Sequence, residues 1–166
     1  MKLTLIWITL AMLLGAISQE YPLKIVLKNE MKVSWNYQQD RIFFEISAPT
    51  DGWVAIGFNA GSDLTGAYLL MGRVVAGEVE VVEYVTLSPG DYRPITTMGE
   101  QSQVAGIRGM GNAMTTQLRF SIPIQTSHAF RKDLSEGAQF TMTMAFSRSK
   151  DFQHHSVMRT SVEVTL

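Results

Sequence analysis

Apolar and polar side chains alternate with a period of two along most of this chain, and this period limits its possible folds more than any other feature. Four segments show it most clearly: residues 41–47, 52–58, 139–147 and 160–166. In the third segment, Phe140 and Met142 share one face, whereas Thr141 and Thr143 lie on the other. Successive side chains of a β-strand point to opposite faces. The pattern therefore predicts strands with one buried face.

Further strands and the turns between them complete the fold prediction. Five other segments are rich in β-branched and aromatic residues: 23–27, 32–37, 68–75, 78–86 and 116–122. The dipeptide Ala76-Gly77 lies between two Val- and Glu-rich segments and predicts a tight hairpin. Helical periodicity is weak. Eight to ten short strands at this spacing predict an all-β chain, folded as an antiparallel β-sandwich.

The first 18 residues have the features of a secretory signal peptide. Lys2 forms a short positive region, residues 3–14 are an almost unbroken apolar run, and Ala16-Ile17-Ser18 predicts cleavage after Ser18. The run is shorter than the roughly 20 residues that span a bilayer. We therefore expect a secreted or periplasmic protein with no transmembrane anchor after cleavage. Residues 19–166 are expected to form a single domain.

Composition and missing motifs exclude several classes of function. The chain has 166 residues and no cysteine, which excludes disulfides, thiolate metal sites and a cysteine nucleophile. A formal net charge of −1 argues against nucleic-acid binding by phosphate neutralisation. Gly106, Gly109 and Gly111 lack the order and context of a phosphate-binding loop. Because no catalytic set of residues is recognisable, we do not expect an enzyme.

Histidine is the residue type best suited to hold a metal or cofactor in this chain. There are three histidines, and His154 and His155 are adjacent, just before the last predicted strand. A neutral imidazole is a common ligand of metals and of haem iron. Extending the alternation of residues 160–166 backwards places His154 on the buried face and His155 on the outer face. This parity favours His154 as the ligand.

A glycine-rich segment, residues 98–114, lacks strand periodicity, and we expect it to form a mobile loop. It contains Met98, Met110 and Met114. A thioether in such a loop would be able to close over an apolar ligand or to bind a soft metal such as Cu(I). Packing of the loop on the sandwich is the simpler interpretation of these methionines.

Residues 44–59 and 64–72 resemble the signature of DOMON domains, a family named for the N-terminal region of dopamine β-monooxygenase. The likeness in the order of elements extends over residues 23–166. It includes an early strand with Trp35, the Gly-Trp-Val-Ala-Ile-Gly-Phe strand at 52–58, and a histidine before the final strand. The resemblance implies an immunoglobulin-like β-sandwich that is secreted and binds haem or a sugar-like ligand, often in electron transfer.

The resemblance also implies candidate ligands for haem b. Cytochrome-type members hold b-type haem at one end of the sandwich, between a Met shortly after the Gly-Trp strand and a His near the last strand. His154 or His155 matches that histidine, whereas Leu64 stands where the methionine is expected. Coordination through histidine alone is one alternative. Three methionines are candidates to replace the missing one: Met71, Met110 and Met114.

Several functions therefore remain open. The leading hypothesis is a haem b-binding module that exchanges electrons with a separate redox partner protein. A second is a module that binds a sugar or another small ligand without redox chemistry. A third is a protein-interaction domain, and a fourth is a copper site formed by His154, His155 and Met158. The second hypothesis requires aromatic faces that stack on the ligand. The candidates for such stacking are Trp35, Trp53, Tyr68, Tyr84 and Tyr92.

Overall fold

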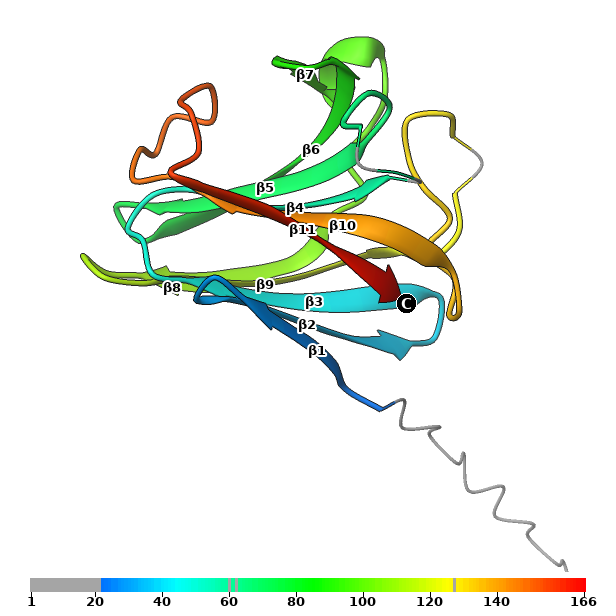
Figure 1. Cartoon of the computed structure of the whole chain (residues 1–166), viewed down its shortest axis with the longest axis horizontal. Coiled ribbons are helices and arrows are strands. Elements are labelled where there is room, and N and C mark those ends of the chain that lie inside the picture. Colours follow the sequence, from blue (N-terminus) through cyan, green and yellow to red (C-terminus); the bar gives the residue numbers. More distant parts are fainter. Residues whose placement is uncertain (1–21, 60, 62, 127) are drawn as a thin grey trace, which may run out of the picture.

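A computed structural model describes residues 22–59, 61, 63–126 and 128–166, which form a two-layer β-sandwich (Figure 1). The predicted all-β, immunoglobulin-like antiparallel sandwich is confirmed. The expected signal peptide, residues 1–18, lies outside the described residues. Within the described part of the chain, no helix is long and apolar enough to cross a membrane.

The strands form two antiparallel sheets. The five-stranded sheet has the order β1-β2-β3-β9-β8, with β1 at Lys24–Lys28, β2 at Met31–Gln38, β3 at Arg41–Ala48, β9 at Thr116–Pro123 and β8 at Ala105–Gly111. The six-stranded sheet has the order β11-β10-β4-β5-β6-β7, with β11 at Met158–Thr165, β10 at Gln139–Phe146, β4 at Val54–Asn59, β5 at Tyr68–Val75, β6 at Glu78–Ser88 and β7 at Asp91–Pro94. A short 3₁₀ helix, η1 (Ile95–Met98), follows β7.

The main core lies between the sheets and consists of the inward positions that the alternation predicts. Phe44 of β3, Phe58 of β4 and Phe120 of β9 are at most 2% exposed. The ring of Phe44 lies 5.7 Å from that of Phe58 and 5.8 Å from that of Phe120, centroid to centroid. Burial of one such side chain stabilises the fold by about 1.5–3 kcal/mol. The two sheets are therefore held together by apolar contacts across the sandwich.

The predicted hairpin at Ala76-Gly77 is confirmed. Ala76 has a φ of 51° and Gly77 a φ of 84°, and the two residues connect β5 to β6. Positive φ at both central residues is typical of the two-residue turns that fit the twist of antiparallel strands. The hairpin fixes the register of β5 against β6.

The expectation of a mobile loop over residues 98–114 was wrong, because the segment contains β8. All residues of β8 are exposed, and it pairs with β9. A Cβ on Gly109 would lie 2.5 Å from the Gln117 carbonyl oxygen and 2.8 Å from Leu118 Cδ2, and one on Gly111 would lie 3.0 Å from Val74 Cβ. Close packing therefore excludes side chains from the inner positions of β8, which hides its alternation.

A buried ion pair joins β6 to the segment between β9 and β10. The Arg131 Nε donates to Glu83 Oε1 at 2.8 Å, and both side chains are at most 4% exposed. Burial opposes ionisation of the Glu83 carboxyl. Hydrogen bonds from Arg131, from the Tyr68 hydroxyl and from the Gln103 backbone N–H outweigh this effect and hold its pKa below the usual value. The carboxylate therefore stays charged inside the protein.

Candidate ligand pocket

The outer face of the six-stranded sheet is hollowed because its central outward positions carry small residues. In the register of β10 against β4, Ala145 lies beside Ala55, and Thr143 lies beside Gly57. A Cβ at Gly57 would collide with the Leu69 side chain. These four small residues form the floor of a trough that runs between two strands.

The sides of the trough differ in chemistry. On one side, β5 places Met71 beside Ala55 and Leu69 beside Gly57. On the other side, β11 places Arg159 beside Ala145. The trough therefore has an apolar thioether side and a cationic side, separated by the two central strands.

A second apolar cluster, distinct from the main core, covers part of this outer face. Trp53 and Met71 are 4% and 3% exposed and belong to it. The Tyr84 ring packs edge-on against Phe152 at 6.0 Å and against Tyr92 at 5.5 Å. Such edge-to-face pairs add to the stabilisation by burial. The outward positions of β4, β5 and β6 are therefore shielded from water here.

The connection between β10 and β11, residues 147–157, is called the histidine loop below. In Figure 1 it rises above the six-stranded sheet, as does the β6–β7 hairpin. The Trp53 N–H donates to the Ser149 carbonyl at 3.0 Å, and the Ser147 N–H donates to the Trp53 carbonyl at 3.0 Å. A Cβ at Gly52 would collide with the Ser147 carbonyl oxygen, so this close approach requires glycine.

Side chains from other strands fix the middle of the histidine loop. The Tyr92 hydroxyl donates to the Phe152 carbonyl. The Arg73 guanidinium lies 4.3 Å from the centroid of the Phe152 ring and donates to the Lys150 carbonyl. A cation over a ring face is attracted by the ring quadrupole. The loop therefore has a fixed position next to the trough.

A pocket lies between the trough, the histidine loop and the β6–β7 hairpin. Its cavity volume is about 190 Å³, and it is open to solvent. Sites that enclose small molecules commonly measure roughly 300–1,000 Å³, so a ligand of that size would extend beyond the rim of this pocket. Leu64, Met71, His154 and His155 all line this pocket. Four positions singled out from the sequence therefore surround one space, on the outer face of a sheet rather than at one end of the sandwich.

The strand alternation from which His154 was preferred over His155 does not reach these residues. The chain leaves β10 after Phe146 and enters β11 only at Met158, so the alternation does not continue through the histidine loop. Both histidines are exposed and both line the pocket. The structure brings them together with Met71 but does not rank them.

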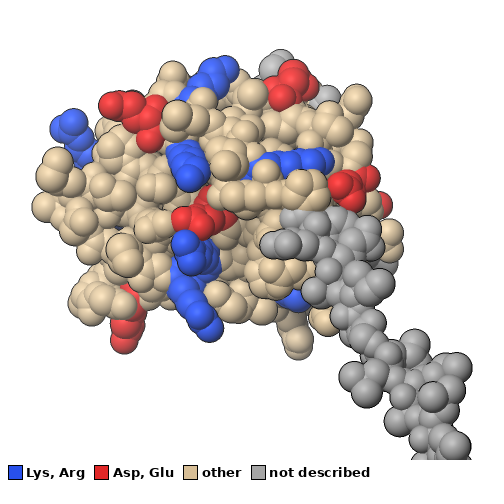
Figure 2. Space-filling model, turned by 90° about the horizontal axis from the view of Figure 1, so that it is seen from below, with Lys and Arg blue, Asp and Glu red and all other residues tan. Residues whose placement is uncertain are grey.

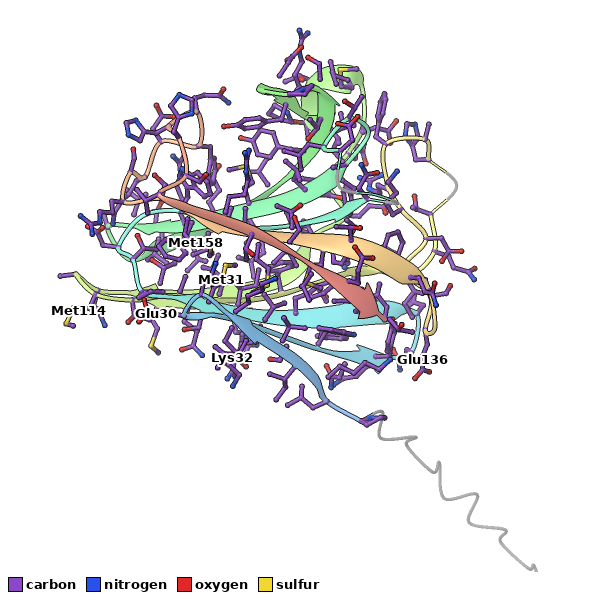
Figure 3. All side chains as sticks on the ribbon, viewed as in Figure 1. Glu30, Met31, Lys32, Met114, Glu136 and Met158 are labelled. Atoms are coloured by element: carbon purple, nitrogen blue, oxygen red, sulfur yellow. The ribbon has the colours of Figure 1, made fainter. Side chains whose placement is uncertain are left out.

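Met110 and Met114 lie away from the pocket. They are 66% and 79% exposed, and Figure 3 shows Met114 at the tip of the β8–β9 hairpin, which belongs to the other sheet. Met158 packs against the main core, on the opposite face of β11 from Arg159, so the copper set of His154, His155 and Met158 is not assembled. Met71 is the one methionine among the described residues that line the pocket.

The aromatic residues considered for ligand stacking separate into two groups. Trp35 and Tyr68 are buried in the main core and have no face available to a ligand. Trp53 and Tyr92 line the pocket, and Tyr84 packs in the outer cluster. Burial, together with the neighbouring Tyr92 and Glu80, raises the pKa of Tyr84 to about 12. Burial and the charge of Asp151 also raise the pKa of Tyr92, so both phenols stay neutral and can donate hydrogen bonds.

Two polar atoms of the pocket wall have no hydrogen-bond partner among the described residues. They are Trp53 Nε1 and Thr86 Oγ1, and both are buried. A buried polar atom without a partner costs roughly 1–3 kcal/mol. Thr86 was not singled out from the sequence, because a threonine on a strand is an ordinary outward residue.

Fold and site together define a small β-sandwich module with an open pocket on the outer face of one sheet. A model of the DOMON domain family matches residues 27–147, which is most of the chain. The chain therefore belongs to the DOMON family, as the residues at 44–59 and 64–72 predicted.

Two curated relatives share part of their sequence with this chain. "MOXD1 homolog 2" of Drosophila melanogaster is 29% identical over 102 residues, which cover 61% of this chain and 13% of the relative. "DBH-like monooxygenase protein 1" of Mus musculus is 26% identical over 124 residues, which cover 74% of this chain and 20% of the relative. The chain thus spans only a fifth or less of the length of these relatives.

Two solved structures share the fold. The cytochrome b domain of pyranose dehydrogenase from Coprinopsis cinerea has a TM-score of 0.61 and 11% identity, covering 85% of this chain and 80% of that domain. The cytochrome domain of cellobiose dehydrogenase from Myriococcum thermophilum has a TM-score of 0.61 and 10% identity, covering 88% and 82%. At these identities the likeness establishes the fold.

Proposed function

We propose that this chain is an exported haem b-binding module for electron transfer, and that the pocket on the six-stranded sheet is its haem site. The observation that carries the proposal is that His154, His155 and Met71 line the same pocket. Imidazole and thioether groups are side chains that bind haem iron in cytochromes. The fold shared with two cytochrome domains supports the proposal.

In this proposal, His154 or His155 supplies an imidazole ligand from the histidine loop. Met71 is the candidate for a thioether ligand from the β5 side, because Leu64 has no donor atom and lines the same pocket. If the Met71 sulfur stays packed in the outer cluster, histidine is the only protein ligand. A bound haem supplies one-electron chemistry by changing the oxidation state of its iron.

The protein supplies position and a dry environment. The outer cluster around Trp53 and Met71 excludes water from one side of the pocket. The contacts of Trp53 with Ser149 and of Tyr92 with Phe152 hold the histidine loop in place before any ligand binds. A pre-positioned ligand loop and a hydrophobic shell both tune the potential of a metal centre.

Export and a separate redox partner are part of the same proposal. The charged, apolar and small-residue regions of residues 1–18 support secretion or delivery to the periplasm. His154 and His155 are exposed at the mouth of the pocket. A partner protein that docks on this mouth would come within a short distance of the bound group.

A second function, binding of a small ligand such as a sugar without redox chemistry, is favoured by a different observation. Trp53 Nε1 and Thr86 Oγ1 are buried at the pocket wall without partners. Hydroxyl groups of a ligand that reached the wall would satisfy both atoms, and the Tyr92 hydroxyl oxygen, which donates to the Phe152 carbonyl, can also accept a hydrogen bond. This function predicts a colourless protein.

An absorption spectrum tests the proposal, recorded as purified and after addition of haem and dithionite. We expect a Soret band with sharp α and β bands on reduction. The double variant His154→Ala/His155→Ala should lose these bands, whereas the control His128→Ala should keep them, because His128 pairs with Glu100 and does not line the pocket. A wild-type protein that takes up no haem would contradict the proposal and leave the second function for a glycan-binding screen.

A further inference from the structure

Arg159 is an unpaired cation at the edge of the pocket. It lies on β11 at an outward position beside Ala145 and is exposed. Its side chain makes no ion pair or hydrogen bond with any described residue. By contrast, the Arg73 guanidinium on the same face pairs with Glu80 at 2.7 Å. The charge of Arg159 is therefore available to a ligand.

The position of Arg159 gives the pocket two different ends. Arg159 is the only Asp, Glu, Lys or Arg side chain among the described residues that line the pocket, and Gln153 and Ser156 also lie on the lining. Met71 lies on the other side of the floor, three strands from Arg159 in the sheet register. Strand spacing puts their backbones roughly 14 Å apart. The pocket thus suits a ligand with an extended apolar body and an anionic edge.

We propose that Arg159 anchors a carboxylate of the bound ligand. The inference rests on the proposed function, in which the ligand is haem and the carboxylate is one of its propionates. A guanidinium presents parallel N–H donors that match the two oxygens of a carboxylate, and it stays charged at every physiological pH. Arg159 is in this view a positioning residue, which sets how the ligand is oriented over the trough.

The same anchor would serve any flat apolar ligand that carries a carboxylate, so the test separates the carboxylate from the iron. Three probes are used: haem, haem dimethyl ester, in which both propionates are blocked, and iron-free protoporphyrin IX. Each is titrated into the wild type, Arg159→Gln, and His154→Ala/His155→Ala. Arg108→Gln is the matched control, because Arg108 is another exposed arginine without a described partner, on the five-stranded sheet.

We expect Arg159→Gln to bind haem roughly tenfold more weakly than the wild type does, since one charge-assisted contact is lost. Haem dimethyl ester should bind both proteins equally.

Arg159→Gln should weaken the binding of protoporphyrin IX, whereas the double histidine variant should bind it as the wild type does. Higher salt should weaken haem binding to the wild type more than to Arg159→Gln, because salt screens an exposed ion pair. Arg159→Lys should recover part of the affinity, and Arg108→Gln should match the wild type.

The outcomes separate the two proposals. If Arg159→Gln loses the same affinity for haem and for its dimethyl ester, the carboxylate anchor is wrong while haem binding stands. If the wild type binds protoporphyrin IX through Arg159 but the double histidine variant binds haem as well as the wild type does, the anchor stands and iron ligation is wrong. A wild type that binds none of the three probes overturns both. Unchanged thermal unfolding of Arg159→Gln confirms that the variant is folded.

Discussion

The two outer faces of the sandwich are built from alternating strands of the same kind, yet only one of them is covered. The face of the five-stranded sheet is open and carries charges of both signs (Figure 2). On this face Arg119 pairs with Glu45 at 3.0 Å, and Leu27 is 72% exposed. The face of the six-stranded sheet instead carries Met71 and Ala145 at outward positions and is covered in part by the histidine loop.

This difference shows what outward residues reveal about a sheet. A strand whose outward positions are charged needs only water on that face. A strand with apolar or small outward residues needs a second layer, because exposed apolar area costs about 25 cal/mol per Å². In this chain the second layer is incomplete, and the uncovered part is the pocket. In this sandwich, the candidate ligand site therefore lies on the outer face that carries apolar and small residues.

The largest contrast between the faces should come from two methionines. Met71→Ala removes a buried side chain of the outer cluster and should lower the free energy of unfolding by about 2–5 kcal/mol. Met110→Ala removes an exposed side chain on β8 and should change it by less than about 0.5 kcal/mol. Urea unfolding of both variants measures the difference. Equal effects would mean that the outer cluster contributes nothing to stability.

Acid should weaken the protein through a group that belongs to neither outer face. The folded pKa of Glu83 lies below its ordinary value, so the stability it contributes is present above that ordinary value and is lost as the pH falls through the folded pKa. Unfolding free energies measured from neutral pH down through the acid range should fall accordingly. Glu83→Gln should be less stable at neutral pH and should show a flatter dependence on pH. An equally steep decline in Glu83→Gln would assign the acid sensitivity to other carboxyls.

A variant with an added ligand for haem iron tests how the covered face would hold haem. Leu64→Met places a thioether at the position where the resemblance to cytochrome-type members implies a methionine. In the case where Met71 stays packed and histidine is the only protein ligand of the wild type, the added thioether should raise haem affinity on the order of tenfold. It should also raise the reduction potential, as in cytochromes with Met/His ligation. Spectra and redox titration measure both. Leu87→Met is the control, because Leu87 is 37% exposed and does not line the pocket. A Leu64→Met spectrum identical to that of the wild type would mean that Leu64 does not face the bound group.

The smallest effect is expected on the open face. Arg119→Gln breaks the exposed ion pair with Glu45 and should cost about 0.2–1 kcal/mol of stability. Haem affinity should not change, because Arg119 does not line the pocket. Calorimetry and a haem titration check both points. Weaker haem binding by Arg119→Gln would indicate that the haem site lies on the five-stranded sheet, contrary to the proposal.

The sequence predicted the fold far better than it predicted the site. Residues 41–47 could be predicted as a strand because every inward position, Ile42, Phe44 and Ile46, carries an apolar side chain. In β8 the inward positions are glycines, and close packing against Leu118 and Val74 is visible only in three dimensions. The four residues of β7 are too few to show any period.

Among the residues that line the pocket, the sequence pointed to those of a rare type or in a family motif. It did not point to residues of a type that is common on any strand. The adjacent pair His154-His155 stands out in a chain with three histidines, and family resemblance drew attention to Leu64 and Met71. Arg159 resembles any outward arginine on an edge strand. Only the register of β11, β10 and β4 places it at the side of a trough of small residues. Pairing between strands distant in the sequence cannot be read from alternation.

The most direct test is an NMR titration that locates the ligand on the protein. Backbone amide shifts of the isotope-labelled protein are compared before and after addition of a diamagnetic metalloporphyrin with haem's propionates. We expect the shifted amides to cluster in β4, β5, β10 and the histidine loop, and those of β1, β2 and β8 to stay unchanged. Shifts confined to the five-stranded sheet, or none at saturating porphyrin, would contradict the claim that the covered face holds the site.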